Sequence, residues 1–347
     1  MYKSLFWDSA PTSVRCAVRF LFAILVFGSC AILLGNDSAV ETGAGGIQLR
    51  KEARISMEKE RLTISLKKVV VEYEFLNTSD GDITTEVAFP IPPYKLDPFF
   101  GGRPDFSSFR VWVDGQELKY HTQVRAEIHG VDYAHLLSSL GISIQDFGHY
   151  NVSAAKGKSQ MATLAKSERE KLVRLGLIEN DGEPDWTTSV TYYWSQRFPA
   201  HKTLHVRHEY APMWGHCPTS EMEFRKMLKE ACIDPSLQKR LREFPTQELE
   251  KHGGRQPTRE AEWVKYILTT ANTWKTPIKD FELVLEEPDP GLRDPQYVGV
   301  SVCWEGELRR VDENHLITRK SDFIPKTELV VYYFEDYYKA GFGEQLK

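Results

Sequence analysis

The sequence lacks the clustered lysines and arginines that are typical of nucleic-acid-binding proteins. It has 49 acidic against 44 basic residues, a formal net charge of -5, and no basic stripe along its length. A protein that holds a phosphate backbone needs such a cluster, because much of its binding free energy comes from releasing the counterions of the phosphates. The charge pattern therefore argues against a nucleic-acid partner.

The common catalytic signatures are also absent. The chain has no Cys-x-x-Cys, no His-Glu-x-x-His and no Gly-x-Ser-x-Gly. Ser65-x-x-Lys68 matches the serine motif of penicillin-binding proteins. That motif needs a helix start and a Lys-Thr-Gly partner, whereas the residues here lie in a β-like stretch and the partner is missing. The sequence thus identifies no catalytic residue and indicates no cofactor, which favours a protein that is not an enzyme.

Long apolar runs are scarce, and the longest one lies near the start of the chain. Phe20 to Leu34 is uncharged and mainly apolar, and it follows the basic residues Lys3, Arg15 and Arg19. A membrane-spanning helix takes about 20 apolar residues, and the core of a secretory signal takes fewer. We therefore interpret residues 1–35 as a signal peptide and expect a periplasmic or extracellular protein with no membrane span once the signal is removed.

The end of this signal has more than one interpretation. Ser29-Cys30-Ala31 fits the small-x-small cleavage rule, and cleavage after Gly35 also fits. Two further alternatives are an uncleaved N-terminal anchor and a lipid attached at Cys30.

Cysteine is rare as well, with 5 in the whole chain. Cys16 and Cys30 fall in the signal, which leaves Cys217, Cys232 and Cys303. Two of these three are expected to form a disulfide in an oxidising compartment. The spacing alone leaves both Cys217–Cys232 and Cys232–Cys303 open.

Most of the chain after the signal has the pattern of β-strands. Lys68 to Asn77 is rich in β-branched and aromatic residues, a turn follows, and Ile83 to Phe89 continues as a strand. Asp114-Gly115 suits the type I′ turn of a hairpin, because both positions take positive φ. We predict a mainly β protein of antiparallel β-sandwich lobes, with an N-terminal lobe at 36–126 and a C-terminal lobe at 185–347.

Two stretches have helical signals instead. Residues 127–184 carry a capping residue at Asp132 and a capping box that begins at Ser167. A second helical segment is expected near 219–250, where Asp234-Pro235 is typical of a helix start. These are the two helical insertions of the predicted fold.

Several short motifs, taken in order, resemble a bacterial family of secreted proteins known as domain of unknown function 4424. The matching stretches cover nearly all of the chain after the signal. They are Asn36-Asp37-Ser38, Gly45-Gly46-Ile47, Val71-x-Tyr73-x-Phe75-x-Asn77-Thr78-Ser79, Val87-Ala88-Phe89-Pro90-Ile91-Pro92, Trp194-x-Gln196-x-Phe198-Pro199-Ala200, Val206-x-His208-x-Tyr210-x-Pro212, Cys232-Ile233-Asp234, Tyr266-Ile267-Leu268-Thr269-Thr270, Asn272-x-Trp274, Pro277-Ile278-x-Asp280-Phe281 and Val300-Ser301-Val302-Cys303.

The resemblance implies no particular activity. It does imply a disulfide, because the family pattern has cysteines at the positions of Cys232 and Cys303. That pairing would leave Cys217 as the odd cysteine. The charged segment Lys239 to Arg259 departs from the pattern, and its role is left open.

Histidines provide the best candidate for a metal site. His201, His205 and His208 lie close together in sequence, and His216 follows. The segment has the pattern of a strand, in which successive side chains alternate between faces, so His205 and His208 should point in opposite directions. Zinc needs three or four convergent ligands. We therefore interpret these residues as ordinary strand histidines and assign no metal ligand.

Tryptophans are frequent after the signal, and exposed tryptophans can stack on sugars. Large aromatic residues more often fill a β-sandwich core, with Trp214 as the best candidate for an exposed one. The seven residues are Trp112, Trp186, Trp194, Trp214, Trp263, Trp274 and Trp304.

Three functional hypotheses follow. The favoured one is a non-catalytic envelope or secreted module that binds a protein partner or associates with itself. The alternative is a periplasmic hydrolase or metalloprotein that uses the His201, His205 and His208 region. A weaker alternative is glycan binding through exposed tryptophans.

Overall fold

A computed structural model gives the structure of the chain, and residues 34–347 form one compact unit. The predicted signal peptide lies outside the described residues. The described residues are 38–43, 46–95, 108–145, 163–180, 182–218, 229–242, 250, 258–288 and 297–337.

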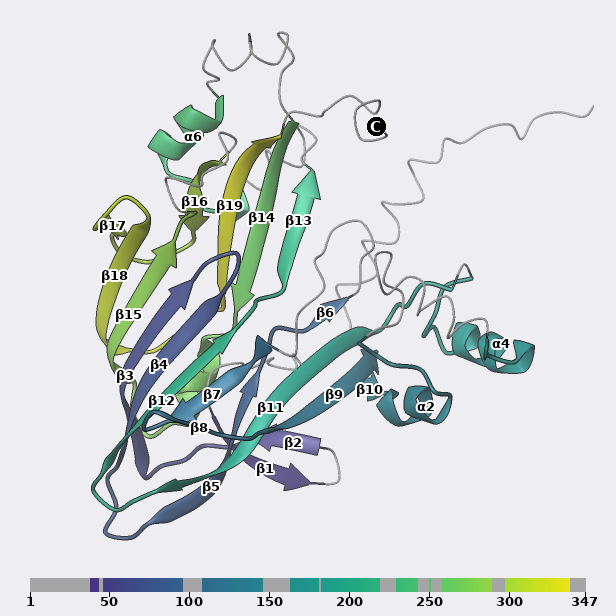
Figure 1. Ribbon diagram of the computed structural model, residues 1–347, viewed down its shortest axis with the longest axis horizontal. Helices are drawn as coiled ribbons and strands as arrows, with labels where there is room; N and C mark the ends of the chain where they lie inside the picture. Colours follow the sequence, from purple (N-terminus) through teal and green to yellow (C-terminus); the bar gives the residue numbers. More distant parts are fainter. Residues whose placement is uncertain are drawn as a thin grey trace, which may run out of the picture. The chain divides into compact units, whose positions relative to one another are not determined.

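The described residues form three β-sheets, which confirms the mainly β prediction (Figure 1). Sheet A has the strand order β10-β9-β11-β5-β1-β2, with β6 also beside β11. Its central strand β11 alternates between buried and more exposed residues, so one face of the sheet is in the core. The strands of sheet A are β1 (Ser38–Gly43), β2 (Gly46–Leu49), β5 (Ile83–Pro90), β6 (Tyr94–Lys95), β9 (His121–Ile128), β10 (Val131–Asp132) and β11 (Thr187–Phe198).

Sheet B has the order β17-β18-β15-β3-β4-β12-β7-β8. Its neighbours are antiparallel except for β15 and β3, which run parallel. Asp114 and Gly115 both have positive φ in the turn between β7 and β8, as the type I′ prediction requires. The strands of sheet B are β3 (Ile55–Ile64), β4 (Val69–Asn77), β7 (Arg110–Val113), β8 (Gln116–Glu117), β12 (Thr203–Tyr210), β15 (Ile278–Glu286), β17 (Arg309–Arg310) and β18 (His315–Phe323).

Sheet C is smaller and has the order β13-β14-β19-β16, all antiparallel. Its strands are β13 (Trp214–Pro218), β14 (Thr258–Tyr266), β16 (Tyr297–Val302) and β19 (Leu329–Tyr337). A short 3-10 helix, η2 (Thr269–Thr273), follows β14.

Several connections carry the chain between the two large sheets, and a side chain links two of them. The turn after β4 leads into β5, and the turn after β11 leads into β12, so each pair of consecutive strands is divided between sheets A and B. The Asn77 side chain joins these two turns, because its Nδ2 donates at 2.9 Å to the carbonyls of both Gly81 and Phe198. Sheets A and B therefore both contain strands from 36–126 and from 185–347, and the boundary expected between two lobes does not separate the sheets.

The inner face of sheet B packs against both other sheets in one continuous core. From sheet A, the Trp194 ring lies 5.3 Å from the ring of His208 in an edge-on contact. From sheet C, the Tyr266 and Tyr73 hydroxyls lie 3.1 Å apart, and the Tyr333 hydroxyl donates to the Ile64 carbonyl. Each large side chain that is fully buried in this way stabilises the fold by roughly 1.5–3 kcal/mol. The opposite face of sheet B carries the side chains that alternate with these core residues along the middle strands.

The first helical insertion contains α2 (Ala134–Ser139) and α4 (Lys166–Arg174). Asp132, predicted as the cap of α2, lies one residue before the N-cap Tyr133, but its carboxylate still accepts the N–H of Ala134 at the start of the helix. The capping box of α4 was predicted to begin at Ser167, but the N-cap of the helix is Ala165, two residues earlier. The Glu168 carboxylate accepts the N–H of Ala165 at 2.9 Å, and this bond closes the first turn without a serine cap.

Candidate binding surface

The outer face of sheet B carries a groove of about 450 Å³. Its floor comes from the middle strands of the sheet, where outward side chains alternate with core residues. Three cations, two carboxylates, an imidazole and an indole give the groove a mixed charge. The lining residues are Lys59, Arg61, Glu72, Tyr73, Glu74, Trp112, Gly115, His205, Val206 and Arg207.

The strand register aligns opposite charges in a row across the sheet. Neighbours in this row are directly opposite each other on adjacent strands, so their side chains lie on the same face. The charges alternate along the row until it ends on an aromatic ring. From β18 to β7 the row is Arg319, Glu282, Arg61, Glu72, Arg207 and Trp112.

Glu282 is the buried anchor of this row, with 7% of its side chain exposed. The Nε of Arg61 lies 2.9 Å from its Oε1, and Arg319 binds its other oxygen. A buried carboxylate without a cation would be strongly destabilising, so these two arginines have a structural role.

Trp112 is covered by guanidinium groups rather than bare. The Cζ atoms of Arg110 and Arg207 both lie 4.8 Å from the centre of its ring. Arg207 also donates from Nη2 to Glu209 at 2.8 Å. These cation–π contacts occupy ring surface that a stacked sugar would need, which weighs against Trp112 as a glycan platform.

The histidines expected near one another do not converge. His205 faces the groove, and His208 is fully buried on the opposite face among Phe89 and Trp194. Burial lowers the pKa of His208 to about 3. His201 lies in the turn after β11, where its Nε2 is 3.0 Å from the Asp80 carboxylate.

His216 pairs through its backbone with Glu262, and its side chain lies outside the described part of the structure. Among the described residues, no three His, Cys, Asp or Glu side chains are arranged to hold a metal ion. Within the described residues, His201, His205 and His208 therefore do not converge as metal ligands.

Three tryptophans belong to the core, namely Trp186, Trp194 and Trp274. Trp214, the predicted exposed one, is half-buried. Trp263 lies flat over Gly215 on the neighbouring strand, where an added Cβ would be 2.1 Å from the ring. Only glycine leaves room for this ring, so the contact explains Trp263 as packing at the sheet edge.

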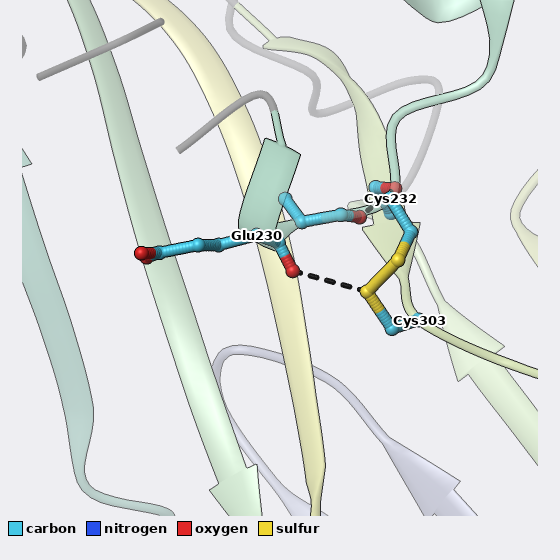
Figure 2. The surroundings of a disulfide bond; sticks show 5 residues. Glu230, Cys232 and Cys303 are labelled. Carbon is cyan, nitrogen blue, oxygen red and sulfur yellow. Dashed lines mark hydrogen bonds between the residues drawn. A yellow bond between two sulfur atoms is a disulfide. The ribbon is translucent and has the colours of Figure 1, made fainter. Parts of the chain in front are cut away.

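A disulfide joins Cys232 to Cys303, the pairing that the family resemblance implies (Figure 2). Cys232 lies just before α6 (Pro235–Arg242), and Cys303 follows β16. The Glu230 carbonyl oxygen lies 3.0 Å from the Cys303 sulfur, which carries no hydrogen to donate while the disulfide is formed.

Helix α6 lies on sheet C through a small separate core. Leu237 and Leu241 pack with Ala261 and Phe334, all fully buried. Asp234 caps the helix, as predicted, because its Oδ1 accepts the N–H groups of the second and third residues that follow it. The remainder of the predicted segment 219–250 lies largely outside the described residues.

Glu262 on β14 provides a test of the electrostatics of sheet C. Burial, and then the nearby Glu335 and Glu260, raise its pKa to about 7. A carboxyl group whose pKa is raised in the folded state costs stability progressively as the pH rises from its ordinary value of 4.5, and the loss is complete above the folded pKa. Glu262→Gln should therefore increase the free energy of unfolding by about 1–2 kcal/mol at pH 8, after allowance for solvent screening, and change it little at pH 5.

Urea unfolding at the two pH values measures this difference. Glu305→Gln is the matched control, because Glu305 is exposed. An equal gain at both pH values would contradict the prediction, since the gain would then arise from packing.

Comparison with known proteins gives one family match. The profile of a family described as "Domain of unknown function (DUF4424)" matches residues 35–332. No curated protein matches the chain. A crystal structure of a proposed nutrient binding protein from Legionella pneumophila is similar at 14% sequence identity and a TM-score of 0.36, over 86% of this chain and 71% of that chain.

No helix in the described part of the chain is both long and apolar enough to cross a membrane.

Proposed function

This chain belongs to the DUF4424 family, and from that premise we propose that it is an exported, non-catalytic module that binds a protein partner through the groove on sheet B. The proposal places the mature protein in the periplasm or outside the cell. Sequencing the N-terminus of the protein recovered from cells tests the export step, since cleavage should leave Ile32 or Asn36 first. A chain that still begins at Met1 would contradict cleavage.

The observation that carries the proposal is the chemistry of the groove. Arginine and tryptophan are the residues most enriched at the energetic centres of protein interfaces, and here Arg207 and Trp112 lie together at its edge. The groove lies on paired strands of a packed sheet, so its side chains are held in place before a partner arrives. Such preorganisation reduces the entropy lost on binding.

The same groove offers little for catalysis. A covalent mechanism needs a nucleophile beside a base, and the groove lining has no serine, cysteine or threonine next to His205. Arg61 and Arg207 are already engaged by Glu282 and Glu209. These features favour recognition over chemistry.

Site-specific photocrosslinking in cells tests the proposal. A photoreactive residue would replace His205 or Trp112 in the groove, and Glu305 on an exposed loop would serve as the control position. We expect both groove positions to capture the same protein in near-stoichiometric yield, and the control position to capture none of it. Mass spectrometry would identify the captured protein.

Three results would count against a protein partner at the groove. Equal capture from Glu305 would place the contact elsewhere, and no capture from the groove would contradict the proposal outright. Capture of a second copy of this chain would show that the groove serves self-association and not a different protein partner.

A further inference from the structure

One carboxylate in the groove is flanked by two arginines but forms a salt bridge with neither. Glu72 lies between Arg61 and Arg207 in the register of sheet B. Even so, within the described residues it has neither a hydrogen bond nor an ion pair, and its side chain is exposed. A carboxylate between two arginines would ordinarily pair with one of them.

Arg61 and Arg207 do not pair with Glu72 because other contacts hold their side chains. Arg61 binds the buried Glu282, and moving it would remove one of the two cations that neutralise that carboxylate. Arg207 is held by its bond to Glu209 and by its position over the Trp112 ring. The groove therefore keeps Glu72 open toward solvent.

Glu74 lies on the same face, two residues further along β4, at a spacing of roughly 7 Å. The distance from its Oε1 to the Nζ of Lys59 is 3.8 Å, too long for a hydrogen bond. His205 is directly opposite Glu74 on β12. The floor of the groove thus presents two carboxylates in a line, with one unpaired and one loosely paired.

We propose that the protein partner presents a lysine or arginine side chain that binds between Glu72 and Glu74. This inference rests on the proposed function, since it names the chemistry that the groove recognises. The charge is complementary, because the cations that line the groove all have carboxylate partners while Glu72 does not. Arg61 and Arg207 flank Glu72 and would repel further basic residues, so a single basic side chain fits better than a basic run.

Short capped peptides provide a direct probe. The pentapeptides Ala-Ala-Lys-Ala-Ala and Ala-Ala-Glu-Ala-Ala would be titrated into the full mature protein labelled with 15N-tryptophan. The indole N–H signal of Trp112, assigned with Trp112→Phe, reports on the groove. We expect a saturable shift with the lysine peptide and none with the glutamate peptide.

Two variants of equal charge identify the anchor. Glu72→Gln should weaken binding of the lysine peptide about tenfold, as loss of a hydrogen bond to a charged group does. Asp280→Asn removes the same charge from the outer face of the same sheet, outside the groove lining, and should bind as the wild type does. Equal binding by Glu72→Gln and the wild type, preference for the glutamate peptide, or no saturable shift would overturn the inference.

The inference can fail while the proposed function stands. His205→Trp should block the groove with a larger ring and prevent capture of the partner from a crosslinker at residue 112. Capture that is lost in His205→Trp but kept in Glu72→Gln would retain the groove and reject the basic anchor. Capture that survives both changes would reject the groove and its anchor together.

Discussion

Breaking the disulfide between Cys232 and Cys303 is expected to lower the free energy of unfolding by about 4 kcal/mol. The bond closes a loop between cysteines 71 residues apart, and a loop of that size greatly restricts the unfolded chain. Helix α6 has little else to hold it, because only Leu237 and Leu241 from the helix enter its small core. The segment around α6 should therefore become sensitive to protease before the large sheets unfold.

The variant Cys232→Ser/Cys303→Ser, compared with the wild type in urea, measures this loss. Dithiothreitol provides an internal control, since it should lower the stability of the wild type to that of the variant and leave the variant unchanged. If the reductant destabilised both proteins equally, the effect would not come from this bond.

Acid is expected to destabilise the protein through His208. Its pKa is about 3 in the folded protein and about 6.5 in an unfolded chain. Over this range His208 is protonated in the unfolded state but stays neutral in the folded state. The free energy of unfolding therefore falls as the pH drops from 6.5 toward 3. The contribution of His208 should decline by about 3 kcal/mol between pH 6.5 and pH 4.

The variant His208→Leu isolates this contribution. Glu262 has the opposite pH dependence, so the quantity to measure is the difference between variant and wild type at each pH. His205→Leu is a matched control from the same strand, since His205 faces the groove and its variant should keep the wild-type pH dependence. A constant difference between His208→Leu and the wild type across this range would mean that His208 does not control the acid response.

The sequence predicted the features that depend on neighbouring residues. The turn at Asp114-Gly115 has its two positive φ angles, and Asp234 caps α6. The alternation of β12 correctly separated His205 from His208. Each of these is decided by backbone geometry within a few residues.

Features that depend on which strands pair could not be predicted in this way. The turn after Asn77 has the residues of a hairpin, yet the strands on its two sides enter different sheets. A hairpin within one sheet and a turn that joins two sheets use similar turn residues, and the packing of the flanking strands decides which of the two forms. Likewise, Glu72 lies among arginines only because β4 pairs with β3 and β12, so nothing in its own segment predicts the groove.

The order of strands in sheet B also affects how the chain folds. Strand β3 comes early, but one of its two neighbours is β15, which is synthesised only after residue 278. Until then β3 has an unpaired edge, and such edges are prone to pair with other chains. Contacts between residues so distant in sequence also slow folding. A chain truncated before β15 should therefore aggregate rather than form a smaller stable domain. The nascent protein should need protection from aggregation until β15 has been synthesised and has paired with β3.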